Sequence, residues 1–355
     1  MWTAPCPPKG PLITPNSFHA PPPSKPSPSQ QPPVTIFFIC GNPGLIGYYH
    51  AFLSLLSANL AGSHEDGPPF QVYGRSLGGF ELDELGGSAA RCYYDLEDQI
   101  CFVMRDLDRL MGESQSGNAT APNGRRKVVL VGHSVGSYIA MEVLRRHRET
   151  PGTGAGTDFD IAGGVMLFPT VVDIAESPSG RKLTRILSFI PHLALLASLL
   201  AALVTYLPDP ILRFLVGTAM RSPPDEVVDT TLGFLKSRRG VRQAIYMGAD
   251  EMQTITTDKW ADDIWGIGTA SGTGSDASAE KPAPRLVFYF GQNDHWVAAQ
   301  TREDIMALRG RKGSDGGGPR MLVCEDGVPH AFCLRHSGVM AGKVAGMIGD
   351  VVDIC

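Results

Sequence analysis

The sequence predicts an α/β fold with a doubly wound, mostly parallel sheet and a helical, apolar insertion. Three observations lead to this prediction. Short apolar segments alternate with segments of helical periodicity, which is typical of parallel strands joined by crossover helices. A glycine-flanked serine stands between one such strand and the helix that follows it. More than a hundred residues, from 169 to 284, then interrupt the alternation before it resumes.

The chain is long enough for one large α/β domain. It has 355 residues, of which 43% are hydrophobic and 19% charged, as expected of a globular protein with a full core. Residues 1–33 contain twelve prolines and no acidic residue, so we expect a disordered, polyproline-like tail. The domain is then expected to span 34–355, with a cap insertion at about 175–265 and a flexible, low-complexity loop at 267–281.

Strands are expected where short runs rich in β-branched and aromatic residues occur. These runs are 34–40, 70–73, 128–131, 163–168, 285–290 and 321–324. Helices are expected where apolar residues recur every three or four positions. Such segments follow residue 44, run from Asp95 to 110, follow the serine turn and end the domain at 339–352. The polar segments 74–87 and 112–126 are expected to be loops.

The strand 128–131 leads into Gly132-His133-Ser134-Val135-Gly136, and a helical pattern follows. A Gly-x-Ser-x-Gly turn between a strand and a helix is the nucleophile elbow of α/β-hydrolases. The serine in such a turn has a strained backbone, and the glycines let the strand and the helix approach closely. An ordinary glycine-rich turn is the alternative, so the assignment of Ser134 depends on finding its partners.

A serine hydroxyl needs a positioned base before it can act as a nucleophile near neutral pH. In α/β-hydrolases the acid and then the histidine follow the serine along the chain. Asp294 comes four residues after the strand 285–290, and His330 comes six residues after Cys324, where the next strand ends. Both then lie with Ser134 at the carboxyl edge of the sheet. We expect His330 to accept the serine proton and Asp294 to orient the imidazole.

Other residues compete for the roles of acid and base. Asp173 follows the strand 163–168, a position from which some hydrolases supply the acid, and it is the alternative to Asp294. Three other histidines are candidates for the base, but they are less well placed than His330. They are His133, His295 and His336.

The oxyanion that forms during acyl transfer needs two hydrogen-bond donors. One is expected to be the backbone N–H of Val135, directly after the nucleophile. The other is expected from the loop after the first strand. Pro43 in this loop has no N–H, so Asn42 is the leading candidate, with Gly44 and Leu45 next.

Composition argues against several other functions. The formal net charge is −5 and long basic runs are absent, which argues against nucleic-acid binding. The seven cysteines are scattered and odd in number, which indicates reduced intracellular thiols rather than a disulfide framework or a zinc site. We identify no phosphate-binding loop, dinucleotide fingerprint or metal cluster, so we expect no cofactor and no metal.

The insertion contains the most apolar part of the chain. Residues 186–207 include no charged side chain, Pro208-Asp209-Pro210 ends the run, and 211–216 is apolar again. Pro191-His192 divides the first run and leaves fewer than the roughly 20 residues that a membrane-spanning helix needs. We expect a pair of apolar helices, broken at 208–210, that lie in a lipid surface or cover a lipid-sized pocket. A wholly buried core helix is the alternative.

Several motifs together carry a resemblance to a known family. They lie at 38–44 with 48–49, 132–136, 167–170 with 175–180, 290–296 and 328–332. Over residues 34–350 the chain resembles the lipid-droplet-associated serine hydrolase family. This resemblance implies an α/β-hydrolase on the cytosolic face of lipid droplets and endoplasmic reticulum, which hydrolyses esters, with sterol esters proposed. By position it also implies Ser134, Asp294 and His330 as the triad.

The leading hypothesis is therefore a hydrolase that cleaves carboxylic esters of lipids at an interface. Burial of an acyl or sterol group beneath the apolar insertion would stabilise the bound ester by about 0.8 kcal/mol per methylene. Two alternatives remain open. One is a droplet-binding structural or regulatory protein with weak or vestigial activity, and the other is a lipid acyltransferase that uses the same residues.

Overall fold

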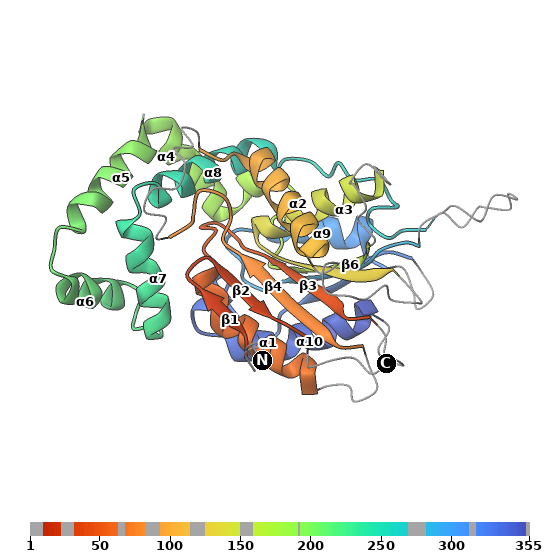
Figure 1. Cartoon of the computed structure of the whole chain (residues 1–355). Coiled ribbons are helices and arrows are strands. Elements are labelled where there is room, and N and C mark those ends of the chain that lie inside the picture. Colours follow the sequence, from red (N-terminus) through yellow and green to blue (C-terminus); the bar gives the residue numbers. More distant parts are fainter. Residues whose placement is uncertain are drawn as a thin grey trace, which may run out of the picture.

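Eight strands of the described part of the chain form a mixed sheet at the centre of the molecule (Figure 1). The computed structural model describes residues 10–22, 32–62, 68–82, 93–113, 125–149, 159–190, 192–268, 282–311 and 317–352. The strands are β1 (Leu12–Thr14), β2 (Ser17–Ala20), β3 (Val34–Ile39), β4 (Phe70–Arg75), β5 (Arg126–His133), β6 (Phe159–Leu167), β7 (Arg285–Phe290) and β8 (Arg320–Val323). Their order across the sheet is β1-β2-β4-β3-β5-β6-β7-β8.

The strands from β3 to β8 run parallel to one another, as the alternation in the sequence predicts. Every residue of β3 is buried, because helices cover both faces of this part of the sheet. β6 begins earlier than predicted, since Phe159 already pairs with Arg126 of β5. The doubly wound, mostly parallel sheet is therefore confirmed, and the carboxyl ends of β3, β5, β7 and β8 share one edge.

The N-terminal segment departs from the prediction. Residues 12–20 were expected to belong to a disordered tail, but they form an antiparallel hairpin, β1 and β2, on the outer edge of β4. Phe18 is fully buried, and the Asn16 side chain exchanges two hydrogen bonds of 2.7 Å with the backbone of Leu82. Prolines can flank these strands because an edge strand leaves some N–H groups unpaired, so a missing N–H removes no hydrogen bond of the sheet. Residues 1–9 and 23–31 lie outside the described residues.

Helices cover both faces of the sheet (Figure 1). After β3, the 3-10 helix η1 (Ile46–Tyr49) leads into α1 (His50–Gly62), which lies beside α10 (Ser337–Val352) on one face. On the other face lie α2 (Leu96–Glu113), α3 (Val135–Glu149) and α9 (Ala299–Arg309). Each of the predicted helices is thus present. Parts of the predicted loops, at 83–87, 114–124 and 269–281, lie outside the described residues.

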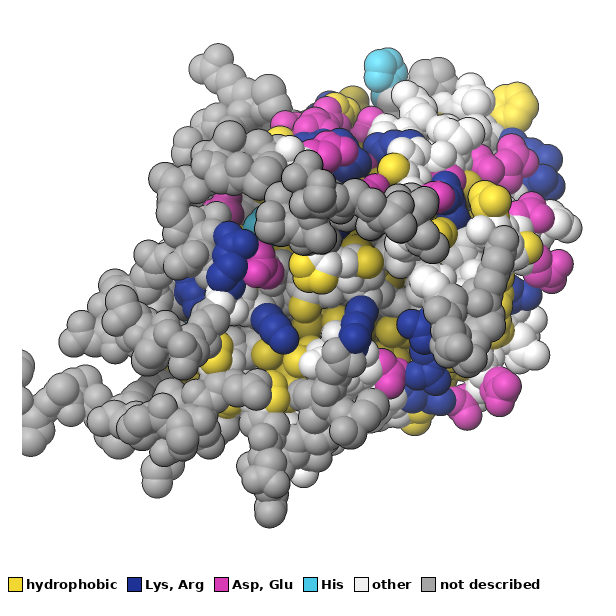
Figure 2. Space-filling model, turned by 90° about the vertical axis from the view of Figure 1, so that its right-hand side faces the viewer, with side chains coloured by type: hydrophobic (Ala, Val, Ile, Leu, Met, Phe, Trp, Pro, Cys, Tyr) yellow, Lys and Arg dark blue, Asp and Glu magenta, His cyan; other side chains and the backbone are white. Residues whose placement is uncertain are grey.

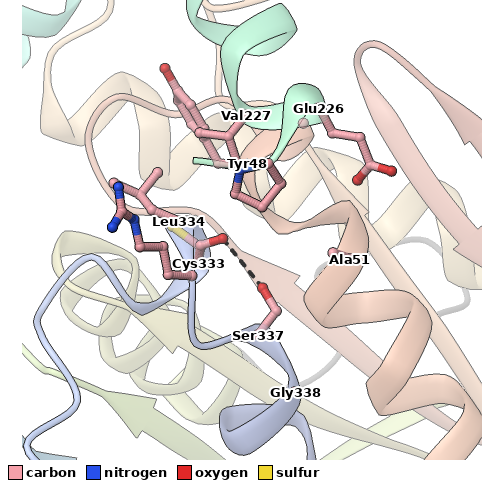
Figure 3. Close-up of a pocket in the computed structure, with 11 residues that line it drawn as sticks. Tyr48, Ala51, Glu226, Val227, Cys333, Leu334, Ser337 and Gly338 are labelled. Carbon is pink, nitrogen blue, oxygen red and sulfur yellow. Dashed lines mark hydrogen bonds between the residues drawn. The ribbon is translucent and has the colours of Figure 1, made fainter. Parts of the chain in front are cut away.

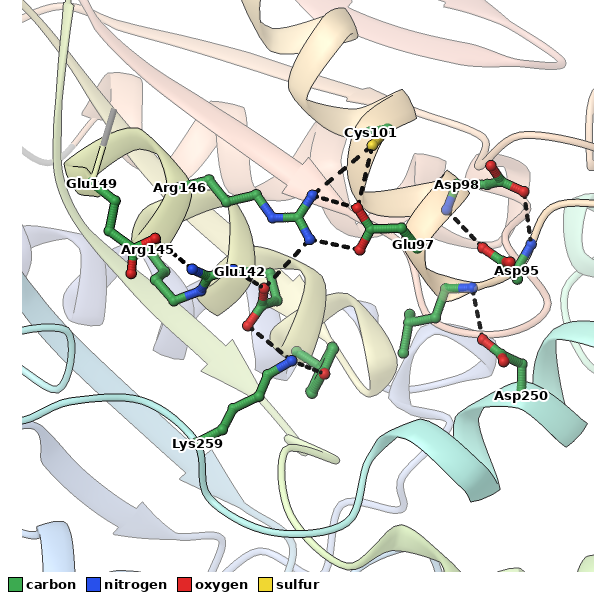
Figure 4. A network of polar contacts seen from close by, with 12 residues as sticks. Asp95, Glu97, Asp98, Cys101, Glu142, Arg145, Arg146, Glu149, Asp250 and Lys259 are labelled. Carbon is green, nitrogen blue, oxygen red and sulfur yellow. Dashed lines mark hydrogen bonds and ion pairs between the residues drawn. The ribbon is translucent and has the colours of Figure 1, made fainter. Parts of the chain in front are cut away.

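A buried carboxylate anchors α3, the helix that follows the serine turn (Figure 4). The Glu142 side chain is 1% exposed and accepts a hydrogen bond of 2.8 Å from Trp260 Nε1. It also forms an ion pair with Lys259, whose Nζ lies 3.2 Å from a carboxylate oxygen. On the same helix, Arg146 pairs with Glu97 of α2 at 2.6 Å. These contacts hold α3 against α2 and against the segment that returns from the insertion.

The described residues between β6 and β7 form five α-helices, which we call the cap. They are α4 (Pro178–Phe189), α5 (Leu193–Val204), α6 (Asp209–Ala219), α7 (Asp225–Lys236) and α8 (Gly240–Thr254). The cap lies at one end of the molecule, on the left in Figure 1. α8 contacts both α5 of the cap and α2 of the core, so it connects the two.

The apolar run of the cap is broken twice. The predicted break at 208–210 is present, because α5 ends at Val204 and α6 begins at Asp209. A second break separates α4 from α5, whose axes meet at 95°. Residue 191 is a proline without the N–H that an uninterrupted helix requires, and His192 has a φ of 61°. No single described helix is long and apolar enough to cross a membrane; only the bent pair α4 and α5 reaches that length.

The helix α5 turns its apolar side outward. None of its residues is buried, which shows that the alternative of a wholly buried core helix is wrong. The large exposed side chains of its outer face are Leu195, Leu196, Leu199, Leu200 and Leu203. Nearby in the chain, Tyr206 is 87% exposed and Phe214 of α6 is 71% exposed. Exposed apolar side chains that lie together are typical of surfaces that contact lipid or another protein.

The end of the molecule opposite the cap has a different surface. Figure 2 shows Lys and Arg side chains beside Asp and Glu side chains there, with smaller apolar areas between them. Among the described residues, the helices of the cap carry most of the exposed large apolar side chains, whereas charged side chains of both signs are visible on the face shown in Figure 2.

Candidate active site

Ser134 occupies the sharp turn between β5 and α3. Its φ is 55°, and its N–H donates to the carbonyl of Leu167 on β6 at 2.9 Å. A Cβ at Gly136 would lie 2.4 Å from the Ile39 oxygen, and a Cβ at Gly132 would lie 2.4 Å from the Gly136 oxygen. Both glycines are therefore required by close backbone contacts, as the turn motif predicts.

The structure brings Asp294 and His330 to Ser134. Nε2 of His330 lies 2.9 Å from the Ser134 hydroxyl oxygen, and Nδ1 lies 2.7 Å from an Asp294 carboxylate oxygen. The other Asp294 oxygen accepts the backbone N–H of Trp296 at 2.8 Å. The side chains of His330 and Asp294 are 8% and 1% exposed. The serine can therefore donate to a histidine whose second nitrogen is held by a buried carboxylate.

The loop after β3 lies against Ser134. A Cβ at Gly41 would lie 3.1 Å from the Ser134 Cβ. Within the described part of the chain, the backbone N–H groups of Asn42 and Val135 have no protein acceptor. The Asn42 side chain is engaged elsewhere, so its backbone N–H is the group available to a developing oxyanion.

Within the described part of the chain, no side-chain hydrogen bond joins Asp173, His295 or His336 to Ser134 or His330. The Asp173 N–H donates to the Thr256 carbonyl, and no bond joins Asp173 to His330 in the described part of the chain. Nδ1 of His295 lies 2.7 Å from the Ser179 hydroxyl at the start of α4. His336 lies directly before α10. Among the described histidines, only His330 is hydrogen-bonded to Ser134.

Two more contacts tie the site loops to the cap. The backbone N–H of Ser179 on α4 donates to the His295 carbonyl, next to Asp294. Arg335, which follows the 3-10 helix η3 (Phe332–Leu334), donates to the carbonyls of Met220 and Arg221 at the end of α6. Sequence reasoning missed these contacts because their partners lie more than a hundred residues apart.

A buried carboxylate of the cap contacts the loop after β3. Glu251 of α8 is 5% exposed and accepts a hydrogen bond of 2.9 Å from the Asn42 side-chain amide, which also donates to the Ala244 carbonyl. Burial raises the pKa of Glu251 to about 8; the Asn42 bond opposes the rise and Asp250 adds to it. The cap thus holds the Asn42 side chain through Glu251, a carboxyl group that stays protonated up to a higher pH than an ordinary glutamic acid.

This raised pKa predicts a loss of stability as the pH rises. The pKa of Glu251 is about 8 in the folded protein and 4.5 ordinarily, so the folded state holds an extra proton between these values. The free energy of unfolding should therefore fall as the pH rises from 4.5 through 8. Glu251→Gln stays neutral, and we expect its melting temperature to be close to that of wild type near pH 5 and several degrees higher above pH 8. Calorimetry across this range tests the prediction, and equal pH dependence in both proteins would contradict it.

A small cavity opens between the core and the cap helix α7 (Figure 3). Its volume is about 120 Å³, and Tyr48, Val227, Cys333 and Leu334 are among the residues that line it. Typical ligand sites measure about 300–1,000 Å³, so this cavity is too small for a lipid ester. None of Ser134, Asp294 and His330 lines it. Among the described residues, no group of His, Cys, Asp and Glu could hold a metal ion.

The sheet and the serine turn define an α/β-hydrolase. Solved structures of similar fold include a haloalkane dehalogenase loop variant from Bradyrhizobium elkanii, with 13% identity, a TM-score of 0.53 and coverage of 95% of this chain and 93% of that one. Juvenile hormone epoxide hydrolase from Bombyx mori has 13% identity and a TM-score of 0.50, and the match covers 95% of this chain and 73% of that one. These likenesses confirm the predicted fold class.

The chain belongs to the lipid-droplet associated hydrolase family, whose sequence profile matches residues 32–333. The lipid droplet-associated hydrolase of Mus musculus is 28% identical over 324 residues, which cover 90% of this chain and 86% of that protein. The lipid droplet-associated hydrolase of Gallus gallus is 25% identical over 332 residues, which cover 92% and 88%. The resemblance seen in the sequence is thus confirmed, and membership of this family supports hydrolase activity.

Proposed function

We propose that the protein hydrolyses carboxylic esters of lipids, with Ser134 as nucleophile, His330 as base and Asp294 as the acid that orients it. The observation that supports this most directly is the position of His330, 2.9 Å from the Ser134 oxygen and 2.7 Å from Asp294. These distances lie within the hydrogen-bond reach that a nucleophile and its base require. Family membership adds support for hydrolysis.

In the first half of the reaction, the Ser134 oxygen attacks the ester carbonyl carbon and its proton passes to Nε2 of His330. Asp294 accepts a hydrogen bond from Nδ1–H and stabilises the imidazolium. The N–H groups of Asn42 and Val135 would bind the oxyanion. When the intermediate collapses, the C–O bond to the alcohol breaks, and His330 returns the proton to the leaving oxygen. Water then repeats the sequence on the acyl-serine and releases the fatty acid.

We also propose that the cap places this reaction at a lipid surface. The outward leucines of α5, together with Phe214 of α6, form an apolar surface that a droplet or bilayer would cover. The name of the family associates its members with lipid droplets. The cytosolic face of droplets and endoplasmic reticulum is accordingly the proposed location. The substrate class that fits is a long-chain ester of glycerol or of a sterol.

An active-site-directed fluorophosphonate tests the nucleophile. We expect the probe to label wild-type protein and a Ser57→Ala control, in which the change lies on α1, but not Ser134→Ala. The control removes a serine that is outside the candidate site. Failure of the probe to label the wild type would overturn the proposal of an activated serine, and would favour a droplet-binding protein with a vestigial site.

The lipids that accumulate in cells carrying Ser134→Ala, compared with wild type, test the substrate class. Accumulation of sterol esters or of acylglycerols would identify the alcohol. Product analysis with the purified protein separates hydrolysis from acyl transfer. If an added lipid alcohol became acylated faster than free acid appeared, the protein would be an acyltransferase rather than a hydrolase.

A further inference from the structure

A buried chain of hydrogen bonds links three loops of the candidate site, and the proposed reaction makes no use of it. It begins at the backbone N–H of Gly41, which donates to the Tyr49 hydroxyl at 3.2 Å. The Tyr49 oxygen lies 2.8 Å from Nδ1 of His133, in the serine turn. Nε2 of His133 lies 2.9 Å from the backbone carbonyl oxygen of His330. This chain of hydrogen bonds thus runs from the loop after β3, through the serine turn, to the loop that carries His330.

The chemistry of these groups permits one arrangement of protons. The His330 carbonyl can only accept, so Nε2 of His133 carries the proton and Nδ1 is an acceptor. Tyr49 must then donate its O–H to Nδ1, and its oxygen accepts the Gly41 N–H. Burial, and to a lesser extent the nearby His330, lowers the pKa of His133 to about 3, so the ring stays neutral. Burial also raises the pKa of Tyr49, so the hydroxyl keeps its proton.

The rings around His133 leave it little freedom to turn. Tyr49, Phe168 and Phe332 surround it, with ring centroids 5.7, 6.1 and 5.0 Å from its own. His133 is 4% exposed and Tyr49 is 3% exposed, so water cannot replace a lost partner without a rearrangement. Loss of either side chain would leave buried donors or acceptors unpaired, and the loops would move to satisfy them.

We propose that His133 and Tyr49 are positioning residues. They hold the loop after β3 and the loop of His330 in fixed positions relative to Ser134. His133 directly precedes Ser134, so its ring is attached to the sharp turn whose N–H is bound by the Leu167 carbonyl. From there it fixes the backbone carbonyl of His330 on one side and, through Tyr49, the N–H of Gly41, the residue before Asn42, on the other. The proposal rests on the proposed ester hydrolysis, because it assigns both loops to that reaction.

Nuclear magnetic resonance on protein with 15N-labelled histidine tests the hydrogen bonds without any need for activity. We expect His133 to be the neutral Nε2–H tautomer from pH 5 to pH 9, with an Nε2 proton that exchanges slowly with water. Its signal is assigned by its absence from His133→Gln. Tyr49→Phe should shift the Nδ1 resonance. Titration of His133 within this range, or a proton on Nδ1, would overturn the proposed arrangement.

Kinetics with a soluble p-nitrophenyl ester test the positioning role. We expect His133→Phe and Tyr49→Phe to lower kcat by about 10- to 100-fold and to leave KM nearly unchanged, because misplaced loops affect the transition state. His133→Gln can still donate to the His330 carbonyl and should recover part of the loss. Both residues belong to the same series of hydrogen bonds, so loss of either one breaks it. The double Phe variant should therefore be no slower than His133→Phe alone.

Tyr73→Phe serves as the matched control. Tyr73 lies on β4, which β3 separates from β5 and the serine turn. The change removes a buried tyrosine hydroxyl that donates to Asp106 of α2. We expect it to lower the melting temperature as Tyr49→Phe does while kcat stays within twofold of wild type. Equal kcat losses in Tyr73→Phe and Tyr49→Phe, or unchanged kcat in both His133→Phe and Tyr49→Phe, would overturn the positioning role. Wild-type protein that no fluorophosphonate labels would instead overturn the proposed function, and the resonance of His133 would still decide the hydrogen-bond arrangement.

Discussion

Replacement of Asp294 by asparagine is expected to lower kcat for ester hydrolysis by about ten-thousandfold, with little change in KM. Asp294 accepts a hydrogen bond from Nδ1–H of His330 and so leaves Nε2 free to take the proton of Ser134. An asparagine amide can donate to Nδ1 and hold the ring in the opposite tautomer, in which Nε2 already carries a proton. The backbone geometry should persist, because the asparagine oxygen can still accept the Trp296 N–H.

The measurement is the initial rate on a soluble ester, together with the melting temperature of each variant. Asp173→Asn is the matched control, since Asp173 is the alternative acid of the sequence prediction and is not bonded to His330 within the described residues. We expect the control to keep nearly the full rate. A collapse of the rate in Asp173→Asn, with Asp294→Asn active, would assign the acid to Asp173 and contradict the proposed triad.

Replacement of three leucines on the outer face of α5 is expected to release the protein from lipid. Leu199, Leu200 and Leu203 are 57%, 63% and 66% exposed. Covering each by lipid should contribute about 1–2 kcal/mol, since a fully buried leucine contributes more. Changing all three to serine or asparagine should therefore weaken partitioning by about a hundredfold or more. The melting temperature should change little, because these side chains contact water in the free protein.

Flotation with phospholipid-coated oil droplets measures this partitioning, and fluorescence microscopy follows the same variants in cells. Leu203→Ser is measured beside the triple variant, and Leu308→Ser is the matched control for this single change. Leu308 lies on α9, outside the cap, and is 64% exposed, against 66% for Leu203, so the control removes the exposed surface of one leucine elsewhere. We expect the control to float with the droplets and the triple α5 variant to remain in the aqueous fraction. Equal flotation of both would contradict the proposed role of the cap as a lipid contact.

The positions of Ser134, Asp294 and His330 could be predicted because a parallel sheet places the ends of its strands at one edge. Each residue follows an apolar run that the sequence displays clearly, and their order along the chain matches the order expected of an α/β-hydrolase. The glycines of the serine turn were also predictable, since a turn this tight tolerates no Cβ at Gly132 or Gly136. These features depend on local pattern and on rules of topology.

Contacts between distant segments could not be predicted in the same way. The bonds from Asn42 to Glu251 and from His133 to the His330 carbonyl join residues about two hundred positions apart, and no periodicity links them. The hairpin at 12–20 was missed because its prolines suggested disorder, whereas pairing with β4 and burial of Phe18 stabilise it. Here tertiary contacts override local propensity.

The sequence alone was enough to predict the parallel strands, the edge at which the candidate site lies, the chain order of its residues and the apolar character of the insertion. Those properties follow from hydrophobic periodicity and strand direction, which are local. Two other properties became visible in the folded chain alone: the leucines of α5 face outward, and Tyr49 reaches His133. The direction of an apolar face depends on what packs against the other side, and the partner of a buried hydroxyl depends on which loops meet. Neither is encoded in any single segment of the chain.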